Sequence, residues 1–255
     1  MLVLRKALLT FLAVIMPFIT YGVLIEPHTV EVHHILIANT SLGIILKDKV
    51  VVHISDLHIR TIGKRELAVL RILNDLQPDI LFLTGDYIQW NGDCKTALSF
   101  LSRLNAKIGI WAVMGDYDYS NSRKSCLFCH EEESGKPSHL HSVHFLRDTV
   151  EKVIFPDGLL WVGGIDMRKD MIPSSDDLAF LKGKTPIIIL SHSPLNFNLL
   201  DQNQEALMLS GDTHGGQVPL PSWLFKVLGY EKSSRYSQGI FEQGVKKMYV
   251  SRGVG

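Results

Sequence analysis

The chain has 255 residues, of which 46% are hydrophobic and 20% are charged, and Lys+Arg and Asp+Glu are balanced at 26 each. This composition is typical of a globular protein and excludes disorder, collagen and coiled coil. A chain without net charge lacks the basic field that attracts nucleic acid, so we expect no nucleic-acid partner. Three cysteines are too few for a disulfide-dense fold.

The amino-terminal residues 1–26 are predicted to form a membrane anchor. Residues 7–25 carry no charged side chain, and their length of 19 is within the roughly 17 to 25 that a spanning helix needs. A cleaved signal peptide is the alternative, but no cleavage site of the A-x-A type precedes Glu26. Arg5 and Lys6 stand before the apolar run, which favours placing the domain at residues 27–255 outside the cytoplasm.

The rest of the chain is predicted to alternate between strands and helices. Strands are expected at residues 29–37, 49–55, 79–84, 108–114, 159–163, 186–191, 205–210 and 248–251, and helices at 64–76 and 96–104. Strand, helix, strand at this spacing predicts βαβ units, an α/β fold and a largely parallel sheet. Residues 120–142 are polar and are expected to form a long loop.

Acidic and histidine side chains follow five of the predicted strands. They are Asp56 with His58, Asp86, Asp116, His192, and Asp212 with His214. Ligands bind at the carboxyl ends of strands in open α/β sheets, so we expect these side chains to meet at one edge. One such residue alone is usually a helix cap or a core residue, but five strand ends in register indicate a shared site. A glycine beside the aspartate at three of these ends would let the backbone approach closely.

The ligand types predict a metal centre. Asp and His together bind divalent ions of intermediate hardness, namely Mn, Fe, Zn or Mg. Seven such side chains exceed what one ion needs and fit two ions that share a carboxylate. Two ions about 3.5–4 Å apart would hold a phosphoryl oxygen and convert a bound water to hydroxide, which predicts hydrolysis of a phosphoester.

The ordered motifs resemble those of calcineurin-like metallophosphoesterases. They are Asp56-x-His58, Gly85-Asp86, the run from Gly115 to Asp118, His192, and the run from Gly211 to His214. The runs THGGQ and YVSRGVG are similar to the membrane-anchored bacterial subgroup, which includes YaeI-type phosphodiesterases and UDP-2,3-diacylglucosamine pyrophosphatases. The resemblance covers about residues 30–255 and implies a four-layer α/β/β/α sandwich. It also implies a bacterial inner-membrane protein that acts on a phosphoester, which we extend to a lipid-linked substrate.

The resemblance also implies roles for individual residues. Asp56, His58 and His214 would hold the first ion, Asp86 would bridge both ions, and Asp116, His192 and Asp212 would hold the second. The family has Asn where Asp116 stands and His where Asp212 stands. Because both replacements can still bind a metal, we favour a site rebuilt with carboxylates over a decayed, catalytically silent one.

Tyr117 is a third departure, at the position of the family's catalytic histidine. A tyrosine with a pKa near 10 donates a hydrogen bond but is a poorer acid than histidine, so a catalytic role for Tyr117 is a hypothesis. Asp118 is expected to position the loop from behind the ligands.

A separate motif lies in the predicted loop. Cys126, Cys129 and His130 match C-x-x-C-H, the pattern of covalent haem attachment. A disulfide or an unremarkable loop is our first interpretation, zinc binding the second and haem the third. A redox-linked protein therefore stays an alternative to the hydrolase.

Overall fold

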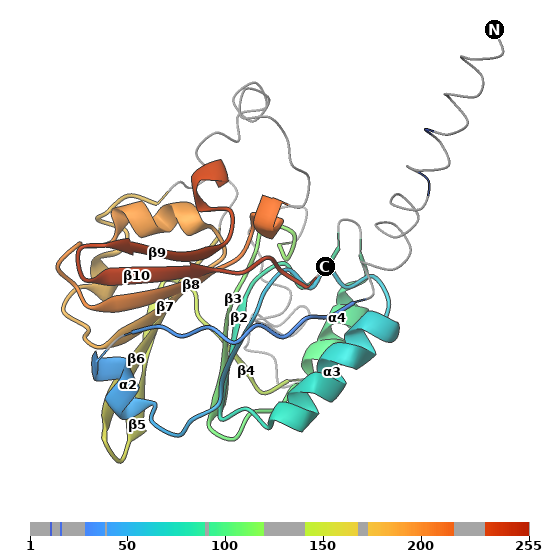
Figure 1. Ribbon diagram of the computed structural model, residues 1–255, viewed down its shortest axis with the longest axis horizontal. Coiled ribbons are helices and arrows are strands. Elements are labelled where there is room, and N and C mark those ends of the chain that lie inside the picture. Colours follow the sequence, from blue (N-terminus) through green and yellow to red (C-terminus); the bar gives the residue numbers. More distant parts are fainter. Residues whose placement is uncertain are drawn as a thin grey trace, which may run out of the picture.

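A computed structural model describes residues 29–38, 40–89, 92–119, 141–167, 173–216 and 233–254, together with Phe11 and Met16 (Figure 1). Within these residues, no helix is long and apolar enough to cross a membrane. Apart from Phe11 and Met16, the predicted anchor at residues 1–26 lies outside the described residues.

The first half of the chain forms a parallel sheet of four strands, in the order β1-β2-β3-β4. Its strands are β1 (Val51–Ile54), β2 (Ile80–Thr84), β3 (Gly109–Val113) and β4 (Val143–Phe145). Helix α3 (Lys64–Leu76) connects β1 to β2, and α4 (Cys94–Leu101) connects β2 to β3. Side-chain hydrogen bonds stabilise the first turn of each helix. At α3 the Glu66 side chain accepts a hydrogen bond from the Gly63 N–H, and at α4 the Asp93 side chain accepts one from the Lys95 N–H.

The second half forms a mixed sheet of six strands, in the order β5-β6-β7-β8-β10-β9. Its strands are β5 (Thr149–Phe155), β6 (Gly158–Ile165), β7 (Ile187–Ser191), β8 (Ala206–Ser210), β9 (Gly239–Gln243) and β10 (Lys246–Val250). The four central strands β6, β7, β8 and β10 are parallel, whereas β5 and β9 pair antiparallel at the two edges. The prediction of a largely parallel sheet thus holds for the first sheet and for the centre of the second, whereas the antiparallel edge strands β5 and β9 were not predicted.

Three apolar clusters separate the layers. Successive residues of β2 show the alternation, because Leu81 and Leu83 face α3 and α4 whereas Ile80 and Phe82 face the second sheet. The outer face of the second sheet packs, within the described residues, on the 3-10 helices η2 (Ala179–Leu181), η3 (Pro194–Leu199) and η5 (Ser233–Tyr236). The helical layer expected on that side therefore consists, in the described part, of short 3-10 turns. Figure 1 shows α3 and α4 on the other side, outside the first sheet.

One sequence-based expectation for local structure needs correction. Residues 29–37 were expected to form a strand, but residues 29–38 are irregular and mostly exposed. The short helix α2 (Thr40–Ile45) follows them and places Leu42 and Ile45 in the cluster between the sheets. Burying these two side chains yields more apolar contact than a strand would obtain at an edge without a partner.

Candidate metal centre

The carboxyl ends of strands from both sheets deliver the predicted side chains to one place. Asp56 and His58 follow β1, Asp86 follows β2 and Asp116 follows β3. His192 follows β7, and Asp212 and His214 follow β8. The cluster therefore lies where the two sheets meet, rather than at the end of a single sheet.

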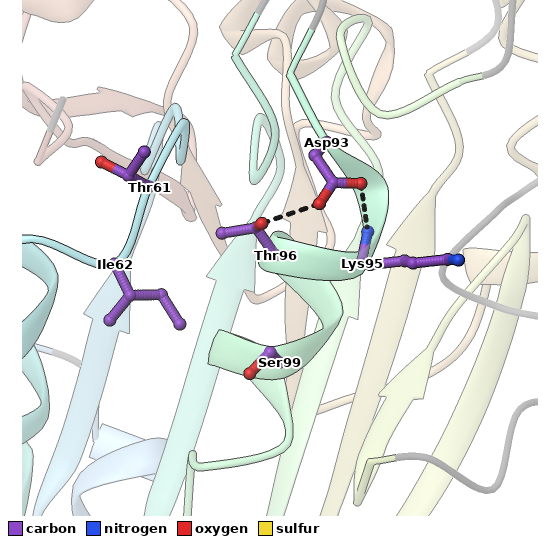
Figure 2. Close-up of a pocket in the computed structure, with 6 residues that line it drawn as sticks. All are labelled: Thr61, Ile62, Asp93, Lys95, Thr96 and Ser99. Carbon is purple, nitrogen blue, oxygen red and sulfur yellow. Dashed lines mark hydrogen bonds between the residues drawn. The ribbon is translucent and has the colours of Figure 1, made fainter.

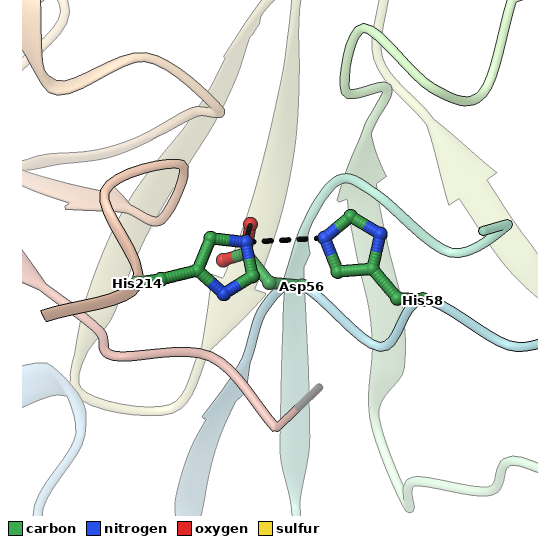
Figure 3. A group of neighbouring side chains, drawn as sticks. All are labelled: Asp56, His58 and His214. Carbon is green, nitrogen blue, oxygen red and sulfur yellow. Dashed lines mark hydrogen bonds and ion pairs between the residues drawn. The ribbon is translucent and has the colours of Figure 1, made fainter. Parts of the chain in front are cut away.

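Asp56, His58 and His214 form one compact group (Figure 3). The Nε2 atoms of the two histidines are 3.1 Å apart, and their rings are stacked. His214 Nε2 is also 3.6 Å from Asp56 Oδ1. Two imidazole nitrogens at this separation require either one shared proton or a common cation. The group is the one that the family resemblance implied for the first ion.

A second group consists of Asp56, Asp86 and His192, so Asp56 belongs to both. His192 Nε2 lies 3.5 Å from Asp86 Oδ1, 3.8 Å from Asp116 Oδ1 and 4.0 Å from Asp212 Oδ1. The other oxygen of Asp86 is 3.5 Å from His58 Nε2. Asp86 thus lies between His58 of the first group and His192 of the second, with one oxygen toward each histidine.

Close backbone approach makes this convergence possible. Five of the proposed ligands have positive φ angles, which L residues adopt at a cost: Asp56, His58, Asp86, Asp212 and His214. Gly115 lies so near Asp86 that a Cβ at residue 115 would overlap Asp86 Oδ1. A Cβ at Gly211 would overlap Ser55 Oγ in the same way. The expectation that glycines permit close approach is confirmed at these two positions.

His192 is oriented as a metal-binding histidine is. Its Nδ1 lies 2.7 Å from the Thr84 carbonyl oxygen, so Nδ1–H donates there and Nε2 points into the cluster. Nε2 is buried and has no hydrogen-bond partner among the described residues. A buried ring nitrogen facing three carboxylates fits a divalent cation.

The electrostatics of the cluster favour a cation. Burial lowers the pKa of His192, but Asp86, Asp56 and Asp212 outweigh it and hold that pKa well above its usual range. Burial raises the pKa of Asp212 to about 6, and Asp56, Asp116 and Asp86 add to the rise against the opposing effect of His192. Carboxylates that raise one another's pKa values are those that a divalent ion stabilises on binding.

Asp118 positions the loops that carry the ligands. Its Oδ2 accepts hydrogen bonds from the Asp86 and Gly115 N–H groups at 2.7 and 2.8 Å. Its Oδ1 accepts from the Tyr87 and Ile88 N–H groups at 2.7 and 3.2 Å. The carboxylate therefore joins the loops after β2 and β3 from behind the cluster. Burial, followed by the charge of Asp86, raises the pKa of Asp118 to about 8, and the N–H donors oppose that rise.

Tyr117 lies beside the first group. Its ring stands edge-on to the His58 ring, with centroids 5.0 Å apart, and its N–H donates to Asp86 Oδ1 at 3.2 Å. The side chain is 36% exposed, so it borders the solvent side of the cluster.

The family comparison can now be set against this geometry. The model of the calcineurin-like phosphoesterase family matches residues 49–216 of the chain. The chain belongs to this family. It is accordingly a hydrolase that acts on phosphoester bonds, in a family of metal-dependent enzymes. The matched region begins just before β1 and ends after His214, so it contains every proposed ligand.

Three bacterial relatives illustrate the similarity. The uncharacterised metallophosphoesterase YkuE of Bacillus subtilis is 25% identical, over 92% of this chain and 82% of that protein. The UDP-2,3-diacylglucosamine pyrophosphatase LpxG of Chlamydia muridarum is 26% identical, over 80% of this chain and 77% of that protein. The phosphodiesterase YaeI of Escherichia coli is 26% identical, over 70% of this chain and 64% of that protein. The predicted family resemblance is confirmed.

Three features of this chain are not explained by the calcineurin-like motif pattern: Asp116, Asp212 and the C-x-x-C-H motif. The two departures at Asp116 and Asp212 lie within 4.0 Å of His192 Nε2, where a metal-binding side chain would be. Cys126, Cys129 and His130 lie outside the described residues, so the disulfide, zinc and haem interpretations stay predictions.

A cavity of about 360 Å³ lies near the start of α4, outside the two ligand groups (Figure 2). Its lining residues are Thr61, Ile62, Asp93, Lys95, Thr96 and Ser99. Asp93 is already engaged there, because it accepts hydrogen bonds from the Lys95 N–H and the Thr96 hydroxyl.

Sequence reasoning missed one charged residue near the cluster. Arg252 follows β10, which pairs parallel with β8, so both strands end at the same edge of the sheet. Strand 248–251 was predicted, and reading the residue after it, as was done for the other strands, would have identified Arg252.

Proposed function

We propose that the protein is a phosphodiesterase or pyrophosphatase with a dinuclear centre of divalent ions, Mn, Fe, Zn or Mg. Asp56, His58 and His214 would hold one ion, and Asp116, His192 and Asp212 the other, with Asp86 bridging. The observation that carries the proposal is the position of Asp86 between two histidines at the junction of the sheets: one of its oxygens is 3.5 Å from His58 Nε2 and the other is 3.5 Å from His192 Nε2. Bound ions of this kind act as Lewis acids toward a phosphoryl oxygen and activate water.

The protein's own residues supply the remaining functions. Asp118 holds the loops of Asp86 and Gly115 in place, which keeps the ligands at fixed distances. The Thr84 carbonyl fixes the ring of His192. Tyr117 is proposed to donate a hydrogen bond toward the leaving group from its place beside His58.

The test is hydrolysis of bis-p-nitrophenyl phosphate and p-nitrophenyl phosphate with Mn, Mg, Fe(II) or Zn added. Asp86→Ala should abolish turnover, whereas Asp157→Ala, at an exposed turn between β5 and β6, should not. Tyr117→Phe should lower kcat while leaving metal content unchanged. Equal turnover in wild type and folded Asp86→Ala would refute the proposed centre.

We also propose a lipid-linked substrate and a single-pass anchor at residues 1–26 in the bacterial inner membrane, with the domain at 27–255 outside the cytoplasm. The similarity to LpxG, whose name specifies a diacylated sugar nucleotide, and the uncharged run at 7–25 support this proposal. Removing residues 1–26 should move the protein from the membrane fraction to the supernatant. Turnover of soluble esters together with inertness toward lipid-linked pyrophosphates would refute the lipid-linked substrate.

A further inference from the structure

Arg252 is fixed to the backbone of the metal centre by its neighbours in sequence. Gly253 has a φ of +81°, and a Cβ there would come within 2.7 Å of Asp56 Cβ. The Val254 N–H donates to the carbonyl oxygens of Ser55 and Asp56 at 3.0 and 3.3 Å. The residues after β10 thus close on Asp56, the residue common to both ligand groups.

The side chain of Arg252 runs across the residue after His214. A Cβ at Gly215 would lie 2.5 Å from Arg252 Cγ and 2.8 Å from Arg252 Cδ, so only a glycine leaves room for this path. The guanidinium then reaches Glu31, whose Oε2 accepts a hydrogen bond from Nη2 at 2.9 Å. The same Nη2 is 3.4 Å from His33 Nε2.

The partnership with Glu31 is a weak one. The Arg252 and Glu31 side chains are 49% and 58% exposed. Exposed ion pairs in water contribute little free energy, because solvent screens both charges. A phosphate, which accepts two parallel hydrogen bonds from one guanidinium, is a stronger partner for Arg252 than an exposed carboxylate that accepts one.

The charge balance of this centre calls for such a cation. Two divalent ions carry four positive charges, and the carboxylates of Asp56, Asp86, Asp116 and Asp212 cancel them. The family pattern, with Asn and His in place of Asp116 and Asp212, would leave a positive surplus. With four carboxylates, the centre of this protein would have no net charge to attract a substrate with two negative charges. The Arg252 guanidinium at the margin of the centre would restore that attraction.

We propose that Arg252 binds the phosphoryl group next to the one attacked, so that the preferred substrates are diphosphate diesters. This inference rests on the proposed function and specifies its substrate class. In a diphosphate diester one oxygen joins the two phosphoryl groups, so the group beside the one attacked would lie at the margin of the ligand groups, where the Arg252 side chain passes Gly215, the residue after His214. Hydrolysis forms a bond between phosphorus and the water oxygen and breaks the bond from that phosphorus to the bridging oxygen. Two phosphate monoesters result, and the two water protons are distributed between them.

The experiment compares Arg252→Gln with Arg103→Gln, which removes the same charge from an exposed site after α4. Kinetics are measured with UDP-glucose, a soluble diphosphate diester, and with bis-p-nitrophenyl phosphate. Binding is measured by calorimetry with a diphosphate diester whose bridging oxygen is replaced by methylene. A charged hydrogen bond of ordinary strength predicts about tenfold weaker binding for Arg252→Gln. The ratio of kcat/KM for UDP-glucose to that for the simple diester should fall about tenfold, through KM.

Arg252→Lys, which keeps the charge but not the two-pronged donor, should show an intermediate loss and replaces Arg252→Gln if that variant does not fold. Equal binding of the methylene analogue by Arg252→Gln and Arg103→Gln would overturn the proposal. An equal fall in kcat/KM for UDP-glucose and for bis-p-nitrophenyl phosphate in Arg252→Gln would overturn it as well. If the wild type cleaves neither substrate with any metal, the proposed function fails, and the binding comparison still decides the role of Arg252.

Discussion

Replacing Asp118 by Asn tests whether this buried carboxylate holds the ligand loops. Four backbone N–H groups donate to it, two at each oxygen. Above its raised pKa of about 8, Asp118 is a charged acceptor. An asparagine keeps one accepting oxygen but turns an N–H₂ group toward two donors, so two hydrogen bonds to that acceptor are lost. At about 1.5–3 kcal/mol each, the loss is about 3–6 kcal/mol. Relief from burying a charge beside Asp86 offsets part of this, and we expect a net destabilisation of about 3 kcal/mol.

The assay is urea unfolding followed by circular dichroism at a pH above the Asp118 pKa of about 8, with metal content measured on the same samples. Asp157→Asn makes the same chemical change at an exposed turn and should stay within about 0.5 kcal/mol of wild type. Asp118→Asn should also bind fewer divalent ions per chain, because the loops of Asp86 and Gly115 lose their common anchor. If Asp118→Asn matches Asp157→Asn in both stability and metal content, the four contacts do not organise the centre and the reasoning is wrong.

Three more outcomes can be measured with the same methods. Gly115→Ala would press a Cβ into Asp86 Oδ1 and should lower metal content, whereas Gly43→Ala, with no heavy atom within 4 Å of the new Cβ, should not. Lys246→Met should cost about 2–4 kcal/mol, because the buried ammonium donates to two carbonyls at 2.7 Å, while Lys247→Met, which loses an ion pair to a largely exposed glutamate, should cost under about 1 kcal/mol. Adding Mn²⁺ to chelator-treated protein at 100 times its dissociation constant should add about 2.7 kcal/mol of stability, and an unchanged Tm would count against a metal centre.

The elements that the sequence predicted well are those whose signals are local. The helix at 64–76 was predicted with its observed bounds, because apolar spacing marks its length and Gln77, in a left-handed conformation, ends it before Pro78. Strands β2, β3, β7 and β8 are continuous apolar runs and were found within one residue at each end. Their buried faces alternate between two clusters, which is why no polar position interrupts the pattern.

The strands that were not predicted depend on partner strands elsewhere in the chain or on turn residues that were not used in the prediction. Strand β5 alternates buried and exposed residues and joins β6 through Asp157-Gly158, a recognised hairpin signal. Strand β9 pairs with β10 across a turn at Gly244, which has positive φ. Strand β4 has only three residues and forms because β3 offers it an edge, which no local pattern indicates.

Much of the candidate site could be foreseen because strand ends share one edge in an open α/β sheet. The seven predicted side chains do converge, but the sequence did not show that they come from two sheets. It also did not show that Asp56 belongs to both groups. The four contacts of Asp118 arise from loop conformations with positive φ, and these are visible only after folding.

The position of the centre at the junction of the sheets has a consequence for how the chain folds. His58 and His214 touch although 156 residues separate them in sequence. Contacts of such long range form late and slowly, because the entropy of closing a long loop must be overcome before they stabilise anything. The first sheet and its two helices draw only on residues up to 145, so they can condense during synthesis while three of the seven proposed ligands, His192, Asp212 and His214, are still absent. High-affinity metal binding should therefore appear only in the last kinetic phase of refolding, which makes it a direct reporter of a completed fold.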